Sequence, residues 1–129
     1  MDLKLNIADK SGKCIKKELK EDAAGFLYGK KIGDKINGES IDMPGYEFEI
    51  AGGSDYCGFP MRKDVNGIMR KQILTTTATG NRYTRTGMRL RRTIAGNTIY
   101  NRTTQINLKV VKYGPTPLIT AAPAEEKKE

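Results

Sequence analysis

The chain has 129 residues, enough for one domain, and it carries a formal net charge of +8 with 37% hydrophobic residues. It contains no histidine and no Cys-x-x-Cys pair. Histidine is the side chain that most often performs acid–base work near neutral pH, and it is a common zinc ligand. The composition therefore argues against histidine-based catalysis and against a four-ligand zinc site. We predict no catalytic residues, no metal site and no cofactor.

Apolar side chains alternate with polar ones at the start of the chain, where Leu3, Leu5 and Ile7 occupy every second position. This period of two predicts a half-buried strand. Turn residues at 9–12 lead to a second alternating segment at 15–19, so the pattern predicts an opening hairpin. The acids of Glu21-Asp22-Ala23-Ala24 predict a short helix, because negative charge is favoured at a helix N-terminus.

Further strands are predicted where β-branched or alternating apolar residues recur, at 46–50, 73–77, 106–110 and, in part, 88–95. Two turns are predicted between the early strands. Asn37-Gly38 is a dipeptide typical of a tight hairpin turn, and Met43-Pro44-Gly45 has the residues of another turn.

Several short strands separated by turns predict an all-β, mainly β, fold: one small β-barrel-like domain over residues 1–113, with a short helix and basic irregular loops. A parallel α/β fold is disfavoured because no long helical pattern alternates with the strands. Residues 114–129 are rich in proline, alanine and glutamate, and we predict that they form a disordered tail.

No segment resembles a signal peptide or is long enough to span a membrane. We therefore expect a cytoplasmic protein in which Cys14 and Cys57 are reduced thiols. A disulfide between them is the less favoured alternative.

The positive charge is concentrated in one half of the chain. All eight arginines lie between Gly52 and Arg102, together with two lysines and only two acids, Asp55 and Asp64. So many like charges would repel one another on a bare surface, and a nucleic acid would neutralise them. RNA is favoured over DNA because no DNA-binding helix motif is present and a β framework with basic loops suits RNA. We predict that residues 52–102 form the RNA-binding half, through Gly52, Gly53, Arg62, Lys63, Arg70, Lys71, Arg82, Tyr83, Arg85, Arg89, Arg91, Arg92 and Arg102.

Some of these residues have two open interpretations. The segment 52–61, which opens with the double glycine Gly52-Gly53 and is stiffened by Pro60, predicts either a rigid loop pressed against a phosphate backbone or a tight interstrand turn without a ligand. Tyr83 could stack on a base or anchor its loop. For Asp55 and Asp64, structural roles are favoured over a catalytic carboxylate pair.

The densest cation cluster lies in the predicted strand around Leu90. Strand alternation places Arg89 and Arg91 on one side and puts Arg92 on the side of Leu90 and Ile94. Because an arginine is awkward on an apolar side, we expect a bulge or an early end of the strand at Arg92. We also expect much of 60–102 to become ordered only when RNA binds.

The segment Ile50-Ala51-Gly52-Gly53-Ser54-Asp55, followed by Gly58-Phe59-Pro60-Met61, resembles the signature of the small-subunit ribosomal protein S6e family of archaea and eukaryotes. Four other parts of the chain are similar to that family: residues 29–34, residues 43–46, the basic run 89–99, and the closing strand 105–111. The resemblance covers about residues 1–112, and the short form is similar to archaeal members. The tail has no serine, so the phosphorylated C-terminal helix of eukaryotic members is not carried over.

The resemblance implies a structural ribosomal protein, not an enzyme, that is built on a β-barrel core. It implies small-subunit rRNA and neighbouring small-subunit proteins as partners, with no membrane and no small-molecule substrate. The alternative is a free-standing RNA-binding regulatory protein outside the ribosome.

Overall fold

The structure is a computed structural model that describes residues 2–82 and 85–118. The chain opens with the predicted hairpin, formed by β1 (Leu3–Ala8) and β2 (Cys14–Leu19), which pair antiparallel. Leu3, Leu5 and Ile7 are buried while the residues between them are more exposed, as the period of two requires. The predicted short helix follows as α1 (Glu21–Ala24), which continues as a 3₁₀ turn, η1 (Gly25–Leu27).

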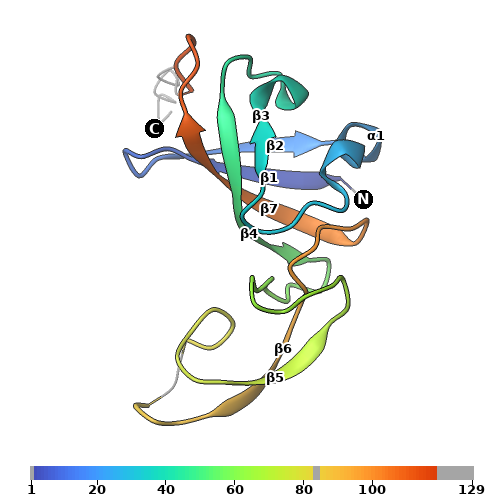
Figure 1. The fold of residues 1–129 in the computed structure, drawn as a ribbon, viewed down its shortest axis with the longest axis vertical. Coiled ribbons are helices and arrows are strands. Elements are labelled where there is room, and N and C mark those ends of the chain that lie inside the picture. The colour runs from blue at the N-terminus through green and yellow to red at the C-terminus, as the bar shows by residue number, and fades with distance from the viewer. Residues whose placement is uncertain (1, 83–84, 119–129) are drawn as a thin grey trace, which may run out of the picture.

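Five strands form the main sheet in the order β2-β1-β7-β4-β3. The central strands are β7 (Thr103–Lys112) and β4 (Glu47–Asp55), which pair antiparallel, and β1 joins β7 in parallel. The mainly β prediction is confirmed. The sheet does not close into a barrel, however, because the two edge strands β2 and β3 (Lys35–Asn37) do not pair with each other. Figure 1 shows the open sheet with α1 at one end.

The core lies on one face of this sheet, where alternate residues of β1, β4 and β7 are buried beneath the helical turns. The fully buried side chains from these strands are Leu3, Leu5, Ile7, Phe48, Ile50, Ile106 and Leu108. Leu27 and Ile41, which come from η1 and from a second 3₁₀ turn, η2 (Gly38–Ile41), complete this packing. Burial of this apolar face is what holds the sheet and the short helices together.

The predicted hairpin turn at Asn37-Gly38 is wrong. Gly38 begins η2, and the connection from β3 to β4 runs from Gly38 to Tyr46. Glycine is needed at this point for space, because a Cβ at Gly38 would lie 2.2 Å from the Met43 carbonyl oxygen. The predicted turn around Pro44 is present.

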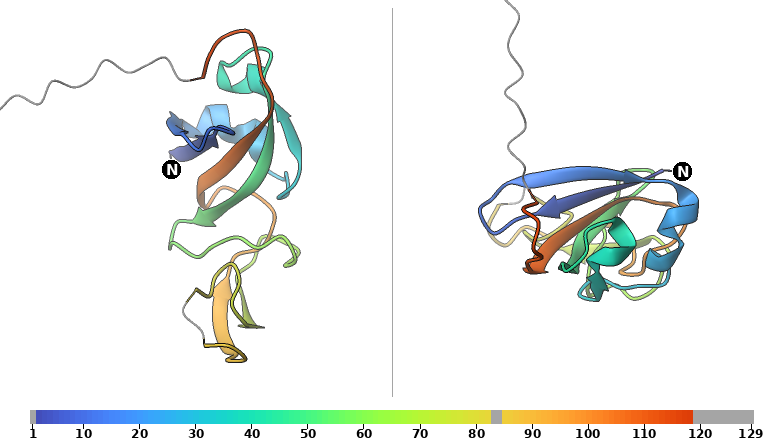
Figure 2. Two further views of the ribbon diagram at one scale, coloured as in Figure 1. Left: turned by 90° about the vertical axis from the view of Figure 1, so that its left-hand side faces the viewer. Right: turned by 90° about the horizontal axis from the view of Figure 1, so that it is seen from above.

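A second, two-stranded sheet projects from the main one. It is the antiparallel hairpin of β5 (Lys71–Thr75) and β6 (Leu90–Ile94), at the lower end of Figure 1. Figure 2 shows the same separation from the side. The chain reaches this hairpin through residues 56–70 and returns through 95–102.

The segments on both sides of the hairpin belong to the core. Met61, Ala95 and Ile99 are buried members of the main hydrophobic cluster, and Ile94 is fully buried. Met61 pairs with Ala95 in a parallel bridge. Met61, Ile94, Ala95 and Ile99 thus pack with the core, while the expectation that much of 60–102 becomes ordered only when RNA binds stays a prediction.

Hydrogen exchange should separate the two sheets. We expect the amides of β5 and β6 to exchange at least about tenfold faster than those of β1, β4 and β7 in the free protein, because a two-stranded ribbon is only marginally stable. Exchange measured residue by residue with NMR would check this. Equal protection of both sheets would contradict it.

After β7 the described chain turns back over the core. The Tyr46 hydroxyl donates a hydrogen bond to the Thr116 carbonyl oxygen, and Leu118 packs against the hydrophobic cluster. The predicted disordered tail lies mainly in residues 119–129, which are outside the described residues. Cys14 and Cys57 are both exposed and free, in keeping with the predicted thiols.

Candidate nucleic-acid interface

The double glycine lies inside a strand rather than in a loop or turn. Gly52 and Gly53 are part of β4 and pair with Asn107 and Ile106 of β7, just after a register shift between Ile50 and Gly52. The turn follows β4, where the Gly58 N–H donates to the Asp55 carbonyl oxygen at 3.0 Å. The turn predicted within 52–61 is therefore present, but it follows the two glycines, which remain in β4 because β7 supplies their pairing partners. The contact of this segment with a phosphate backbone stays a prediction.

The two glycines have different reasons for being there. A Cβ at Gly53 would lie 2.3 Å from the Gln105 carbonyl oxygen on β7 and 3.2 Å from the Met61 sulfur. No heavy atom lies within 4 Å of a Cβ built at Gly52. Neither glycine has a positive φ. Gly53 is thus required by the packing of two strands, whereas Gly52 is not required by the fold.

This difference predicts opposite outcomes for two neighbouring substitutions. Gly53→Ala should destabilise the protein by about 1–3 kcal/mol, because the added methyl group overlaps a backbone oxygen that cannot move without disturbing β7. Gly52→Ala should leave stability unchanged or slightly raised, since alanine loses less conformational entropy on folding. Urea unfolding of the two variants checks this. Equal destabilisation by both would contradict it.

Asp55 ends β4 and organises the following turn. Its carboxylate is 2% exposed and accepts hydrogen bonds from the backbone N–H groups of Cys57 at 2.9 Å and Phe59 at 3.1 Å. Its second oxygen pairs with Nε of Arg70. This contact raises the pKa of the Arg70 guanidinium above its ordinary value. Asp55 therefore has the structural role that the sequence favoured.

Arg70 also stacks between aromatic rings. Its guanidinium carbon lies 4.7 Å from the ring centroid of Tyr56 and 5.1 Å from that of Phe59. Arg102 lies 5.8 Å from the centroid of the same Tyr56 ring. Arg70, predicted as an RNA-binding residue, is thus already held by Asp55 and by two aromatic faces.

Arg62 has an internal partner as well. Its Nε and one terminal nitrogen donate to the two carboxylate oxygens of Asp64 at 2.8 and 2.6 Å, and its other nitrogen reaches the Thr79 carbonyl oxygen at 3.4 Å. The hydrogen bonds that Arg62 donates lower the pKa of the Asp64 carboxyl, and the same hydrogen bonds raise the pKa of the Arg62 guanidinium. The two acids of the basic half therefore each hold one arginine.

The remaining positive charges gather on the projecting hairpin. We call the basic residues of β5, of β6 and of the loop between them the hairpin cations: Lys71, Arg82, Arg85, Arg89, Arg91 and Arg92. All six are exposed, and none forms an ion pair with any residue that the structure describes. Lys63, on the segment that leads to the hairpin, is also exposed. Tyr83 lies outside the described residues.

Strand register distributes the arginines of β6 over both faces of the hairpin. Arg91 is opposite Leu74, and Arg92 is opposite Ile73. Pairing continues without a shift from Leu90 to Ile94, so the bulge or early strand end predicted at Arg92 is wrong. A bulge is not needed, because the two-stranded ribbon leaves Arg92 exposed even on the side of buried Ile94.

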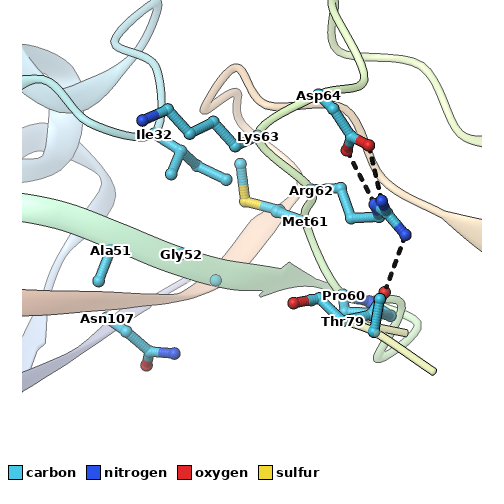
Figure 3. A pocket seen from close by; sticks show the side chains of 12 residues that line it. Ile32, Ala51, Gly52, Pro60, Met61, Arg62, Lys63, Asp64, Thr79 and Asn107 are labelled. Atoms are coloured by element: carbon cyan, nitrogen blue, oxygen red, sulfur yellow. Dashed lines mark hydrogen bonds and ion pairs between the residues drawn. The ribbon is translucent and has the colours of Figure 1, made fainter. Parts of the chain in front are cut away.

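Three shallow hollows meet beside this hairpin, and all three include Ala78. One contains Arg82 and Arg92, a second contains Arg89 and Leu74, and the third lies over Gly52 of β4. Figure 3 shows the third, with Lys63 and Met61 on one side of the strand and Arg62 and Thr79 at its far end. The two glycines and five of the predicted cations are thus brought onto adjoining surfaces: Arg62, Lys63, Arg82, Arg89 and Arg92.

Exposed apolar side chains on and next to the hairpin were missed by the sequence reasoning. Leu74 is 59% exposed and Met69 is 72% exposed, with Ile68 and Met88 also exposed. The sequence predicts a strand at Leu74. It does not predict that β5 and β6 form a sheet of two strands, which leaves Leu74 exposed. The sequence carries no signal for this arrangement.

Within the described ranges 2–82 and 85–118 there is neither a candidate metal site nor a helix suited to span a membrane. No group of three or more His, Cys, Asp or Glu side chains there is placed to hold a metal ion. None of the helices in those ranges has the length and apolar character needed to cross a membrane.

The fold and its surface define a small mainly β protein with a hairpin that projects from an open sheet and carries six exposed cations without an ion pair among the described residues. A family model described as ribosomal protein S6e matches residues 3–122. The chain belongs to this family, whose members are structural proteins and not enzymes. The resemblance seen in the sequence is thereby confirmed.

Curated relatives are similar over nearly their whole length. The chain is 47% identical to the small ribosomal subunit protein eS6 of Thermoplasma acidophilum, over 95% of this chain and 94% of the relative. It is 44% identical to the eS6 protein of Methanococcus maripaludis strain C6, over 92% and 94%. The eS6 protein of Nanoarchaeum equitans is 47% identical, over 89% and 85%. All three sources are archaea, as the short form predicted.

Proposed function

We propose that the chain is a structural constituent of the small ribosomal subunit in the cytoplasm, and that it binds small-subunit rRNA through its basic half. The observation that carries this is the set of six hairpin cations, exposed and without an acidic partner among the described residues. Arginine offers planar donors that match phosphate oxygens, so the surface suits an RNA backbone.

The arrangement of the hairpin supports the same proposal. It extends away from the main sheet (Figures 1 and 2), and its residues Lys71, Leu74, Arg91 and Arg92 are exposed. Arg91 and Arg92 leave opposite faces of β6, so the hairpin can contact phosphates on two sides when inserted between RNA strands. Neighbouring small-subunit proteins are the second class of partner that we propose, as the names of the relatives suggest.

Salt dependence of rRNA affinity tests the electrostatic basis of this function. If each of the six hairpin cations neutralises one phosphate, a plot of log affinity against log salt should have a slope of about −4 to −5. The probe is in vitro transcribed small-subunit rRNA of Thermoplasma acidophilum, measured by filter binding between low and moderate salt. A flat plot would exclude a phosphate-binding surface.

Sedimentation separates the ribosomal role from a free-standing regulator. A constituent of the subunit should follow the small-subunit peak in a cell extract at moderate salt. Recovery of the protein only in light fractions, with rRNA binding retained, would favour the free-standing RNA-binding regulatory protein.

A further inference from the structure

We propose that the groove over Gly52 binds one unpaired nucleotide of the RNA that the hairpin engages. This inference rests on the proposed function and deepens it, because it assigns separate roles to the two adjacent glycines. It starts from the finding that Gly52 is a glycine that the fold does not require.

Glycine is unfavourable in the interior of a strand, because it loses the most conformational freedom on folding and packs no side chain. Such a glycine often marks a bulge, a tight bend or the close approach of another group, and a register shift directly precedes Gly52 in β4. Gly52 has no positive φ, and nothing lies within 4 Å of its missing Cβ. The neighbouring Gly53, by contrast, has the Gln105 carbonyl oxygen only 2.3 Å from its missing Cβ. The space above Gly52 is therefore open, and a side chain there would fill it.

That space is part of a defined groove. It encloses about 620 Å³, which is within the ~300–1,000 Å³ typical of sites for small ligands. Its walls combine apolar groups from Ile32 and Met61 with polar or charged ones from Lys63 and Thr79 (Figure 3). A nucleotide has the same combination, because its base is flat and largely apolar on its faces and its phosphate is anionic.

Charge at the rim suits an anion. Asp64 also lines the groove, but its carboxylate is neutralised by both hydrogen bonds from Arg62. Lys63 is exposed and has no acidic partner among the described residues. The side chain that remains available at this rim is therefore a cation.

The groove is continuous with the surface of the hairpin. It shares Pro60, Ala78 and Thr79 with the hollow that contains Arg82 and Arg92. An RNA strand whose phosphates contact the hairpin cations thus passes directly by the groove. Bases in a duplex are stacked and cannot enter a pocket of this kind, whereas an unpaired base can be turned out. This selects an unpaired nucleotide as the occupant.

Side chains of increasing size at Gly52 test the proposal. The variants Gly52→Ala, Gly52→Val and Gly52→Leu should bind the Thermoplasma acidophilum small-subunit rRNA transcript progressively more weakly, with a loss of about tenfold or more for leucine. Their melting temperatures should equal or exceed that of the parent protein. Ala8→Leu, on β1 and outside the groove, is the matched control and should bind like the parent.

Chemical probing of the rRNA identifies the nucleotide that enters the groove. The parent protein should protect at least one unpaired nucleotide that becomes reactive with Gly52→Leu, while the protections that disappear in Arg91→Gln remain in the leucine variant. Parent-like affinity and protections for Gly52→Leu would overturn the nucleotide groove and leave the proposed function standing. An equal loss of affinity in Ala8→Leu would overturn it too. A parent protein that binds no rRNA would refute both the groove and the proposed function.

Discussion

Replacing Asp55 with alanine is expected to lower the free energy of unfolding by about 3 kcal/mol, since hydrogen bonds to a charged group contribute about 1.5–3 kcal/mol each. The buried carboxylate accepts two backbone N–H groups, from Cys57 and Phe59, and both would lose their partner. Arg70 would also lose the oxygen that positions it between Tyr56 and Phe59. Urea unfolding followed by circular dichroism measures the change.

Asp64→Ala is the matched control. Asp64 is also an acid of the basic half with an arginine partner, but its side chain is 60% exposed, and exposed ion pairs contribute little to stability. We expect no measurable change in unfolding for this variant. Asp55→Asn should fall between the two, because an amide oxygen can still accept the backbone N–H groups. A loss for Asp64→Ala as large as that for Asp55→Ala would contradict the structural role of Asp55.

Much of the fold could be predicted because it follows local rules. The alternation of Leu3, Leu5 and Ile7, and that of Phe48 and Ile50, reports which face of a strand is buried, and the structure buries those residues. Closure of the sheet is a different matter, because it depends on whether the two edge strands reach each other. No local pattern encodes that distance, and the predicted barrel is an open sheet.

The glycine predictions missed the roles of Gly38 and Gly53 for a related reason. Asn37-Gly38 and Gly52-Gly53 both suggest turns when read locally. In the structure, Gly38 and Gly53 are needed because another backbone atom lies where a Cβ would be, from Met43 of the same connection and from Gln105 of β7 respectively. A glycine in the sequence indicates that the backbone needs either conformational freedom or room for a neighbouring atom, but the local sequence does not show which of the two applies.

For the candidate site, the sequence located the cations but did not say which of them are free. The pair of Asp55 and Arg70 joins residues 15 positions apart, across the turn and the loop that follows it. Only the folded chain brings them together. In the basic half, Arg62 and Arg70 have carboxylate partners, Arg102 lies over the Tyr56 ring, and the hairpin cations have no ion pair among the described residues.

The second large effect should be on RNA binding. Changing Arg89, Arg91 and Arg92 together to glutamine is expected to weaken binding to small-subunit rRNA about a hundredfold, at roughly fivefold for each phosphate that the variant no longer binds. The slope of log affinity against log salt should become shallower by about 2 to 2.5 units, because each phosphate left without its arginine keeps its counterions. All three side chains are exposed, so the melting temperature should change little.

Two comparison variants separate geometry from net charge. Lys13, Lys16 and Lys20 are exposed residues in or next to β2, an edge strand of the main sheet that Figure 1 shows apart from the hairpin. Changing them together to glutamine removes the same charge. This control should lose at most a few fold in affinity.

Arg89 and Arg91 together changed to lysine keep the charge but lose the planar pair of donors, so binding should still weaken by several fold. If the lysine variant binds like the parent, the hairpin contributes only its net positive charge to binding, and the donor geometry of arginine does not matter. If the sheet control loses as much as the hairpin triple variant, the RNA does not bind preferentially at the hairpin.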